Sequence, residues 1–249
     1  MQRLGRNMWR FPAGLLIGFV ACAAHAQCVV KSAPQRVQLI ELYTSEGCSS
    51  CPPADRWLSA LAPHPQRIAV AFHVDYWNDL GWPDRFSDAR FSDRQHDIAA
   101  KQLRKAVYTP EVHVDGRDFR RWASGAPEPA GLTEVALSLR ALRVNPTRLD
   151  VRLETSAAPD RDRRVVFVVS ENGLTSEIRD GENAGKTLHH DHVVRAYQTM
   201  KISRMATTSL KLPADLHDEH ARVVAWIEDG ATGTVRNAIT TALSACGPN

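Results

Sequence analysis

The chain has 249 residues, of which 43% are hydrophobic, and its 31 Lys and Arg against 28 Asp and Glu give a net charge of +3. Arg3, Arg6 and Arg10 account for the whole excess, so the rest of the chain is neutral by formal charge. That balance argues against a nucleic-acid partner. The length and the apolar content allow one large domain or two small ones, each with a real core.

The first 26 residues have the pattern of a secretory signal peptide. The three arginines precede a short apolar run over 13–24, and Ala24-His25-Ala26 supplies an A-x-A cleavage site. The run is shorter than the roughly 20 residues that a membrane-spanning helix needs. We therefore expect a signal peptide over 1–26 and an exported mature chain, periplasmic or extracellular, that has no membrane span. A lipoprotein acylated at Cys22 is the alternative, although the neighbouring residues fit it poorly.

Removal of that segment leaves four cysteines, which are Cys28, Cys48, Cys51 and Cys246. An even number of cysteines in an oxidising compartment favours disulfides over free thiols. The simplest pairing joins Cys48 to Cys51 and makes a structural disulfide of Cys28 and Cys246. Two other pairings stay open at this point.

The first half of the mature chain alternates predicted strands and helices. Apolar runs predict strands over 37–43 and 68–74, and an alternating run over 107–116 ends at Asp115-Gly116, a hairpin signal. Helical periodicity predicts helices, which span 53–62, 87–104 and 132–142. This succession predicts an α/β fold, a mixed sheet with helices on its faces.

From Asn145 onward the pattern changes to short, alternating apolar runs separated by Gly, Asn, Asp and Pro. The runs cover 149–153, 165–169, 193–197, 210–212, 223–227 and 235–239. Such a pattern is typical of antiparallel β structure. We therefore expect one domain over 27–144 and a β-rich, mostly antiparallel domain over 145–249.

The C-x-x-C sequence of Cys48 and Cys51 lies between a predicted strand and a predicted helix. This context favours thiol–disulfide exchange, with Cys48 as the nucleophile and Cys51 as the resolving cysteine. The positive end of the helix would lower the pKa of the Cys48 thiol. Glu46 would raise that pKa if its carboxylate pointed at the sulfur.

Two other uses of the cysteine pair remain open. The pair is a permanent structural disulfide in one of them, and its thiolates handle copper or zinc in the other. A zinc site wants about four ligands, and the mature chain has no second C-x-x-C. His189-His190-Asp191-His192 lacks a cysteine or carboxylate placed to complete a site, so we expect neither a metal nor a cofactor. No helix follows Gly181 and Gly185, which therefore indicate a shaped loop rather than a phosphate cradle.

Thr109 and Pro110 form the second candidate element. A proline at a strand entry cannot donate to the ladder, and a plain strand-start proline is the simple interpretation. The functional interpretation is a cis-proline loop against the dithiol, where backbone pairs with a bound peptide.

Three aromatic residues, Tyr76, Trp77 and Trp82, follow the second strand in a turn-rich loop. They form either an apolar lip for a peptide or small ligand, or simple filling beneath the next helix. His73 and Asp75 flank them. The histidine either assists proton transfer or pairs with a backbone carbonyl.

Four motifs carry a resemblance to a known family: TSEGCSSCPPAD at 44–55, FHVDYW at 72–77, VYTP at 107–110 and GENAGKTL at 181–188. Together they resemble the thioredoxin-like superfamily and, within it, a bacterial secreted family of unknown function. The resemblance implies a thioredoxin-like domain over 27–144. The C-x-x-C context together with Thr109-Pro110 predicts a protein or low-molecular-weight thiol or disulfide as the substrate.

The chain departs from ordinary thioredoxins in three places. Gly47 replaces the usual aromatic residue, Leu42 replaces the usual buried acid, and Ser49-Ser50 differs from the known dipeptides. These departures keep a rival function open. In that rival, the chain is a non-catalytic binding module with a permanent Cys48–Cys51 disulfide.

Overall fold

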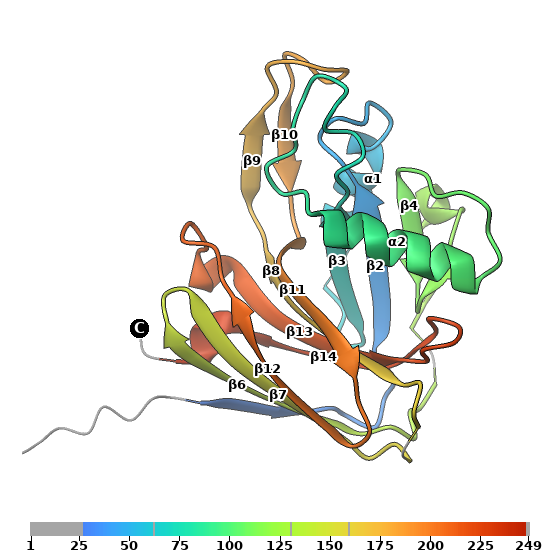
Figure 1. The fold of residues 1–249 in the computed structure, drawn as a ribbon, viewed down its shortest axis with the longest axis vertical. Coiled ribbons are helices and arrows are strands. Elements are labelled where there is room, and N and C mark those ends of the chain that lie inside the picture. Colours follow the sequence, from blue (N-terminus) through green and yellow to red (C-terminus); the bar gives the residue numbers. More distant parts are fainter. Residues whose placement is uncertain (1–26, 62, 130, 159, 248–249) are drawn as a thin grey trace, which may run out of the picture.

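The computed structural model describes residues 27–247 except 62, 130 and 159, so the expected signal peptide over 1–26 lies outside the described residues. In this part of the chain, fourteen strands form three sheets and are accompanied by two α-helices (Figure 1). Neither of these helices is long and apolar enough to cross a bilayer.

An eight-stranded sheet runs through both halves of the chain. In spatial order its strands are β14 (Val235–Ala242), β13 (Ala221–Glu228), β8 (Arg164–Glu171), β11 (Val193–Lys201), β3 (Arg67–His73), β2 (Gln38–Thr44), β4 (Glu111–Val114) and β5 (Arg117–Asp118). β3 runs parallel to both β2 and β11, and the other pairs are antiparallel. β3 therefore joins the two halves of the sheet.

A second sheet of four strands packs on the β14–β11 side. Its strands in order are β1 (Cys28–Lys31), β6 (Leu137–Asn145), β7 (Arg148–Thr155) and β12 (Met205–Lys211). Alternate side chains such as Leu139 and Val151 face Phe167 and Val223 across the core. This arrangement is a β-sandwich, because each sheet buries every second residue against the other.

A disulfide between Cys28 and Cys246 closes this sandwich. Cys28 begins β1, whereas Cys246 follows the short 3-10 turn Leu243–Ala245 after β14. The expected pairing of the four cysteines is therefore confirmed.

The two α-helices cover opposite faces of the β3–β2 region. α1 (Pro52–Ser59) packs through Leu58 on Ile40 and Leu42, and α2 (Ala89–Lys101) packs through Phe91 and Ile98 on the other face. The carboxylate of Asp88 caps α2 by accepting the Arg90 amide at 2.9 Å. In the described residues, α-helices therefore cover both faces of the sheet only around β2 and β3, the strands next to the C-x-x-C turn.

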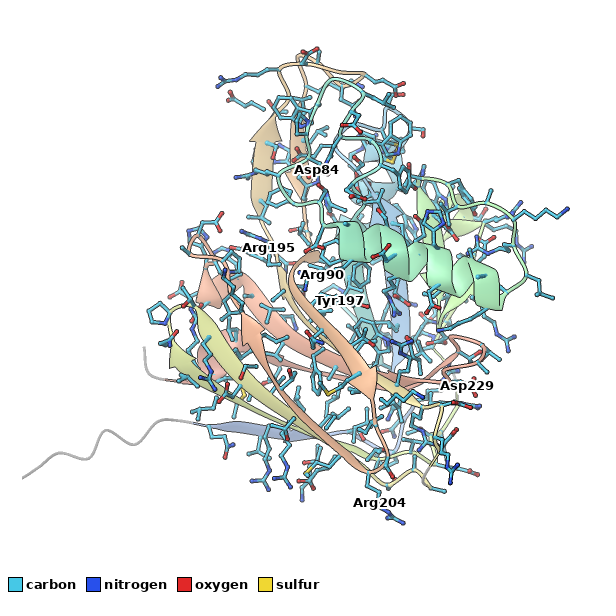
Figure 2. All side chains as sticks on the ribbon, viewed as in Figure 1. Asp84, Arg90, Arg195, Tyr197, Arg204 and Asp229 are labelled. Carbon is cyan, nitrogen blue, oxygen red and sulfur yellow. A yellow bond between two sulfur atoms is a disulfide. The ribbon has the colours of Figure 1, made fainter. Side chains whose placement is uncertain are left out.

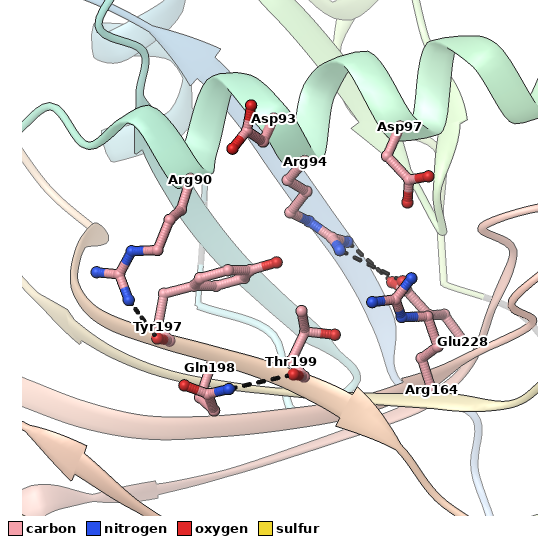
Figure 3. Close-up of a pocket in the computed structure, with 9 residues that line it drawn as sticks. All are labelled: Arg90, Asp93, Arg94, Asp97, Arg164, Tyr197, Gln198, Thr199 and Glu228. Carbon is pink, nitrogen blue, oxygen red and sulfur yellow. Dashed lines mark hydrogen bonds and ion pairs between the residues drawn. The ribbon is translucent and has the colours of Figure 1, made fainter.

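Arg94 fastens α2 to two strands of the sheet. Its guanidinium donates to Glu41 on β2 at 2.8 and 2.9 Å and to Glu228 on β13 at 2.9 Å, and all three side chains are buried. Figure 3 shows it in a cavity of about 300 Å³, whose lining is Arg90, Asp93, Arg94, Asp97, Arg164, Tyr197, Gln198, Thr199 and Glu228. The three arginines and three acidic side chains that line this cavity give it no net formal charge.

A small hairpin forms the third sheet. β9 (Leu174–Glu177) and β10 (Thr187–His190) stand at the same end of the molecule as the start of α1 (Figure 1). The loop that joins them, residues 178–186, is called the cover loop below. Neither strand is predicted from the sequence, because each is short and carries few apolar residues.

The hairpin turn predicted at the end of the run over 107–116 is confirmed. β4 and β5 are joined by Asp115 and Gly116, whose φ angles of 52° and 79° lie in the left-handed region. Gly116 has a second reason to lack a side chain, since a Cβ there would collide with the carbonyl oxygen of Gly233.

The expected fold class is wrong. An α/β thioredoxin-like domain with helices flanking a mixed sheet, followed by an antiparallel region, is replaced by a mostly β fold with three sheets and two α-helices in the described residues. One error is the helix over 132–142, where the chain forms β6. Leu137, Leu139 and Ala141 alternate inward there, so a two-residue period overrides the helical spacing.

Candidate functional site

The C-x-x-C turn links β2 to α1 and holds a disulfide between Cys48 and Cys51. Cys51 is the N-cap of α1, and Pro52 and Pro53 fill the first turn, where missing N–H groups cost the helix nothing. Both cysteines are 0% exposed, although Ser49 and Ser50 between them are exposed. The disulfide is therefore at the surface of the fold but closed to solvent.

A cluster of buried polar side chains lies at the same end of the sheet. Its members come from the ends of β2, β3 and β10, from α1 and from the loop after β3, and they are Thr44, Glu46, Asp55, His73, Asp84 and His190. Each is at most 9% exposed. Asp84 is labelled at this end of the molecule in Figure 2. Among the described residues, no three His, Cys, Asp or Glu side chains are placed to hold a metal ion.

Asp55 lies one helical turn after Cys51, whose carbonyl accepts the Asp55 amide at 3.1 Å. Residues four apart share a helix face, so Asp55 and Cys51 lie on the same face of α1. Near the Asp55 carboxyl lie Thr44, His73 and His190. Burial raises the pKa of Asp55, and this outweighs the opposing effects of His73 and His190. Asp55 is thus a buried acid that holds its proton more tightly than an exposed aspartate.

His73 and Asp84 form a buried ion pair, with 2.7 Å between Nδ1 and Oδ2. Burial alone would lower the pKa of His73, but the charge and hydrogen bond of Asp84 raise it above its ordinary value. The pKa of Asp84 is lowered, because the pairing with His73 outweighs burial. Asp84 also accepts the amides of Glu46 and Phe86, at 2.8 and 2.9 Å. His73 therefore pairs with a carboxylate rather than with a backbone carbonyl.

Glu46 faces Trp82 and His190. One carboxylate oxygen accepts the Trp82 indole N–H at 2.8 Å, and the other lies 3.3 Å from His190 Nε2. Burial would raise the pKa of Glu46, yet its contacts with His190 and Ser176 and the hydrogen bond from Trp82 lower it overall. Glu46 is thus a stabilised carboxylate. His190 joins this cluster, a role that the sequence pattern of histidines does not indicate.

Trp77 lies between the C-x-x-C turn and the proline loop. Its indole N–H donates to Thr109 Oγ1 at 2.9 Å, and its Cβ lies 3.1 Å from where a Cβ on Gly47 would be. The Thr109–Pro110 peptide bond is cis. Gly47 is small because Trp77 occupies the space that an aromatic side chain at position 47 would need.

The three aromatic residues of the loop after β3 have different environments. Trp82 is tied to Glu46 and Trp77 to Thr109, whereas Tyr76 is 39% exposed and donates to Gln95 Oε1 at 3.2 Å. The structure thus brings Cys48, Cys51, Trp77, Trp82 and Thr109 to one end of the sheet. The structural disulfide of Cys28 and Cys246 lies apart, in the sandwich.

The cover loop is bonded directly to the C-x-x-C turn. Asn183 is fully buried, and its amide nitrogen donates to the carbonyl oxygens of Glu46 at 2.8 Å and Cys48 at 3.0 Å. The exposed Glu182 accepts the Ser49 amide at 3.1 Å. Sequence reasoning misses both residues as part of the site, and their only signal is the GENAGKTL motif.

The comparisons with known proteins place the chain in a family. A family model described as "Protein of unknown function (DUF1223)" matches residues 39–228, so the chain belongs to that family. No curated protein matches the chain. The crystal structure of protein AGR_C_4864 from Agrobacterium tumefaciens is similar, with a TM-score of 0.53 and 22% sequence identity over 84% of this chain and 95% of that chain. At that identity the similarity concerns the fold alone. The expected membership of a family of unknown function is confirmed.

Proposed function

We propose that the Cys48–Cys51 disulfide exchanges with a protein or low-molecular-weight thiol or disulfide substrate. The observation that carries this proposal is the place of the disulfide at the start of α1, one turn from the buried acid Asp55. Disulfide exchange needs a pair of close cysteines and a group that supplies or accepts a proton. The two disulfides support an exported location, since such bonds persist in oxidising compartments.

The chemistry follows from the roles of the two cysteines. A substrate thiolate attacks Cys48 Sγ, the bond to Cys51 Sγ breaks, and its electron pair stays on Cys51 Sγ. A second substrate thiolate then attacks the mixed disulfide and releases the substrate disulfide and the Cys48 thiolate. Two substrate thiols are oxidised as the protein disulfide is reduced, and the reverse sequence reduces a substrate disulfide.

Asp55 supplies the proton in this scheme. The carboxyl gives its proton to the leaving Cys51 sulfur, and in the reverse direction the carboxylate takes the proton from the Cys51 thiol before Cys51 attacks. General acid–base catalysis of this kind contributes roughly 10²–10⁴-fold. We expect Asp55→Asn to slow exchange by about 10²-fold while Cys48 and Cys51 still form their disulfide, with rates measured by stopped-flow in glutathione buffers.

Trapping tests the proposal itself. In Cys51→Ala, a mixed disulfide at Cys48 has no resolving partner, so covalent complexes should accumulate in cells and appear as shifted bands without reductant. The Cys48→Ser/Cys51→Ala double variant is the matched control and should trap nothing. The proposal fails if Cys51→Ala traps nothing and the reduction potential of the pair lies below about −300 mV, outside the range of about −120 to −270 mV of exchange proteins.

A permanent disulfide in a non-catalytic binding module is favoured by one observation, the complete burial of both cysteines. In that case Tyr76 and the loop around it bind a peptide or another ligand, and the thiols never react. A Cys48→Ser/Cys51→Ser variant that retains full function in cells would decide for this second candidate. Copper or zinc handling by the reduced pair is tested by metal analysis after purification under reducing conditions.

A further inference from the structure

We infer that the cover loop is a gate over the Cys48–Cys51 disulfide and that Asn183 is its latch. The inference concerns the regulation of the site under Proposed function and takes its physiological meaning from that function. It begins from the burial of both cysteines, because a thiolate must approach the attacked sulfur directly and in line with the bond that breaks. With both cysteines 0% exposed, exchange requires that a neighbouring segment move.

The cover loop is the neighbouring segment that can leave the C-x-x-C turn without disrupting the main sheet. The other neighbours, Trp77 and the buried cluster around Glu46 and His73, belong to the loop after β3 and the strand ends of the main sheet. The cover loop projects from a two-stranded hairpin that shares no ladder with the eight-stranded sheet. Its movement therefore breaks no ladder hydrogen bond of the main sheet.

Three side-chain contacts hold the gate closed. Asn183 donates to the carbonyls of Glu46 and Cys48, and the Glu182 carboxylate accepts the Ser49 amide. The Lys186 ammonium donates to Asn183 Oδ1 at 2.8 Å and so orients the amide. Because one side chain holds both carbonyls on either side of Gly47, loss of the Asn183 amide removes two of the three contacts at once and leaves the loop held to the turn only by the exposed Glu182–Ser49 bond.

Two glycines flank the segment of the loop that contacts the turn and give it places to bend. Gly181 and Gly185 have φ angles of 74° and 80°, a region that other residues rarely adopt. A Cβ on Gly185 would meet nothing within 4 Å, whereas one on Gly181 would lie 3.1 Å from Trp82 Cβ. The Gly185 amide donates to the Ile178 carbonyl at 2.8 Å, so the base of the loop stays closed while the segment from Gly181 to Ala184, which carries Glu182 and Asn183, is the part that moves.

The test is the rate at which dithiothreitol reduces the Cys48–Cys51 bond, followed by alkylation and peptide mass spectrometry so that Cys28–Cys246 is scored separately. Asn183→Ala and the isosteric Asn183→Asp remove the donor, and each should speed reduction by about tenfold, the value of one to two lost hydrogen bonds. Arg179→Ala, an exposed residue of the same loop, is the matched control and should change the rate by less than twofold.

A gate changes how fast a reagent reaches the disulfide but does not change the equilibrium between the dithiol and the disulfide. Reoxidation should therefore speed up as much as reduction, and the dithiol–disulfide ratio in a glutathione buffer should stay within twofold of wild type. An unchanged rate in folded Asn183 variants would overturn the inference, as would a rate gain matched by a shift of that ratio, since Asn183 would then tune thiolate stability. If both variants fail to fold, hydrogen exchange of the wild type decides. The amides of Ser49 and 181–186 should open together, well before those of β2 and β3, and equal protection would overturn the gate.

These outcomes separate the gate from the proposed function. If the Asn183 variants are reduced faster by dithiothreitol but Cys51→Ala accumulates no mixed disulfide, the gate is supported and the exchange function is contradicted. If Cys51→Ala accumulates mixed disulfides but the Asn183 variants are reduced at the wild-type rate, the exchange function is supported and the gate is contradicted.

Discussion

At the residue scale, Asp55 is a carboxyl whose chemistry is altered by burial. Burial raises its pKa, so the folded chain holds this proton more tightly than the unfolded chain does. Ionised Asp55 therefore costs folding free energy above its folded pKa, and the cost vanishes below its unfolded pKa of about 3.9. We predict that Asp55→Asn raises the free energy of unfolding at neutral pH, with a gain that shrinks as the pH falls. Urea unfolding between pH 4 and pH 8 measures it.

Asp84→Asn is the matched control for that prediction, because the pKa of Asp84 is shifted in the opposite direction. The pKa of Asp84 is lowered by His73, so its charge stabilises the fold above the unfolded pKa and this stability is lost as the pH falls. Asn at position 84 should therefore destabilise the protein at neutral pH. A loss of stability in Asp55→Asn that is the same at every pH would mean that its carboxyl acts only as a hydrogen-bond partner.

Individual residues of the site differ in how far the sequence predicts them. Cys48 and Cys51 are evident because their spacing and their place between a strand and a helix are local signals. Asn183 and His190 lie more than 130 positions from the turn and contact it only through the fold. A single sequence has no local pattern for such contacts, and this is why the cover loop and the buried cluster are visible only in the structure.

At the scale of elements, α2 depends on Arg94. Its removal leaves the carboxylates of Glu41 and Glu228 buried without a counter-charge, a change that typically costs about 3–5 kcal/mol. We predict that Arg94→Met lowers the free energy of unfolding by that amount in urea titrations. Arg90→Met on the same helix removes an ion pair with Asp88 that is much more exposed, so it should cost about 1 kcal/mol or less.

A triple variant sharpens this test. Arg94→Met combined with Glu41→Gln and Glu228→Gln removes the stranded charges, so it should recover part of the stability that Arg94→Met loses. A triple variant that is less stable than Arg94→Met alone would contradict the role of charge and point to packing instead.

The prediction of elements from the sequence fails where two periods coincide. Val135, Leu139 and Leu142 have helical spacing, but Leu137, Leu139 and Ala141 are the residues that β6 buries. Strands such as β8 and β13 are predicted correctly, because their apolar runs of strand length lie between turn residues and have no competing helical spacing. What a strand pairs with is not encoded locally, and the expected fold class fails for this reason.

At the scale of the whole molecule, the Cys28–Cys246 disulfide joins residues 218 positions apart. A cross-link over so long a loop stabilises mainly by restricting the unfolded chain. We predict that Cys28→Ser/Cys246→Ser lowers the free energy of unfolding by about 2–5 kcal/mol, measured by urea titration without reductant. Cys48→Ser/Cys51→Ser opens a loop of only three positions and should cost clearly less on this ground. An equal or larger loss from that control would contradict the entropic account.

The parallel neighbours of β3 have a consequence for the order in which the protein is made. β2 lies on one side of β3 and is synthesised just before it, whereas β11 lies on the other side and leaves the ribosome about 120 residues later. Until then the inner strand β3 is an open edge of the kind that pairs with other chains. Long-range pairing of this type also makes folding slow. A chain that completes its sheet only near its end therefore stays incompletely folded until β11 and its antiparallel neighbours have been made, and until then the edge of β3 is open to pairing with other copies of the chain.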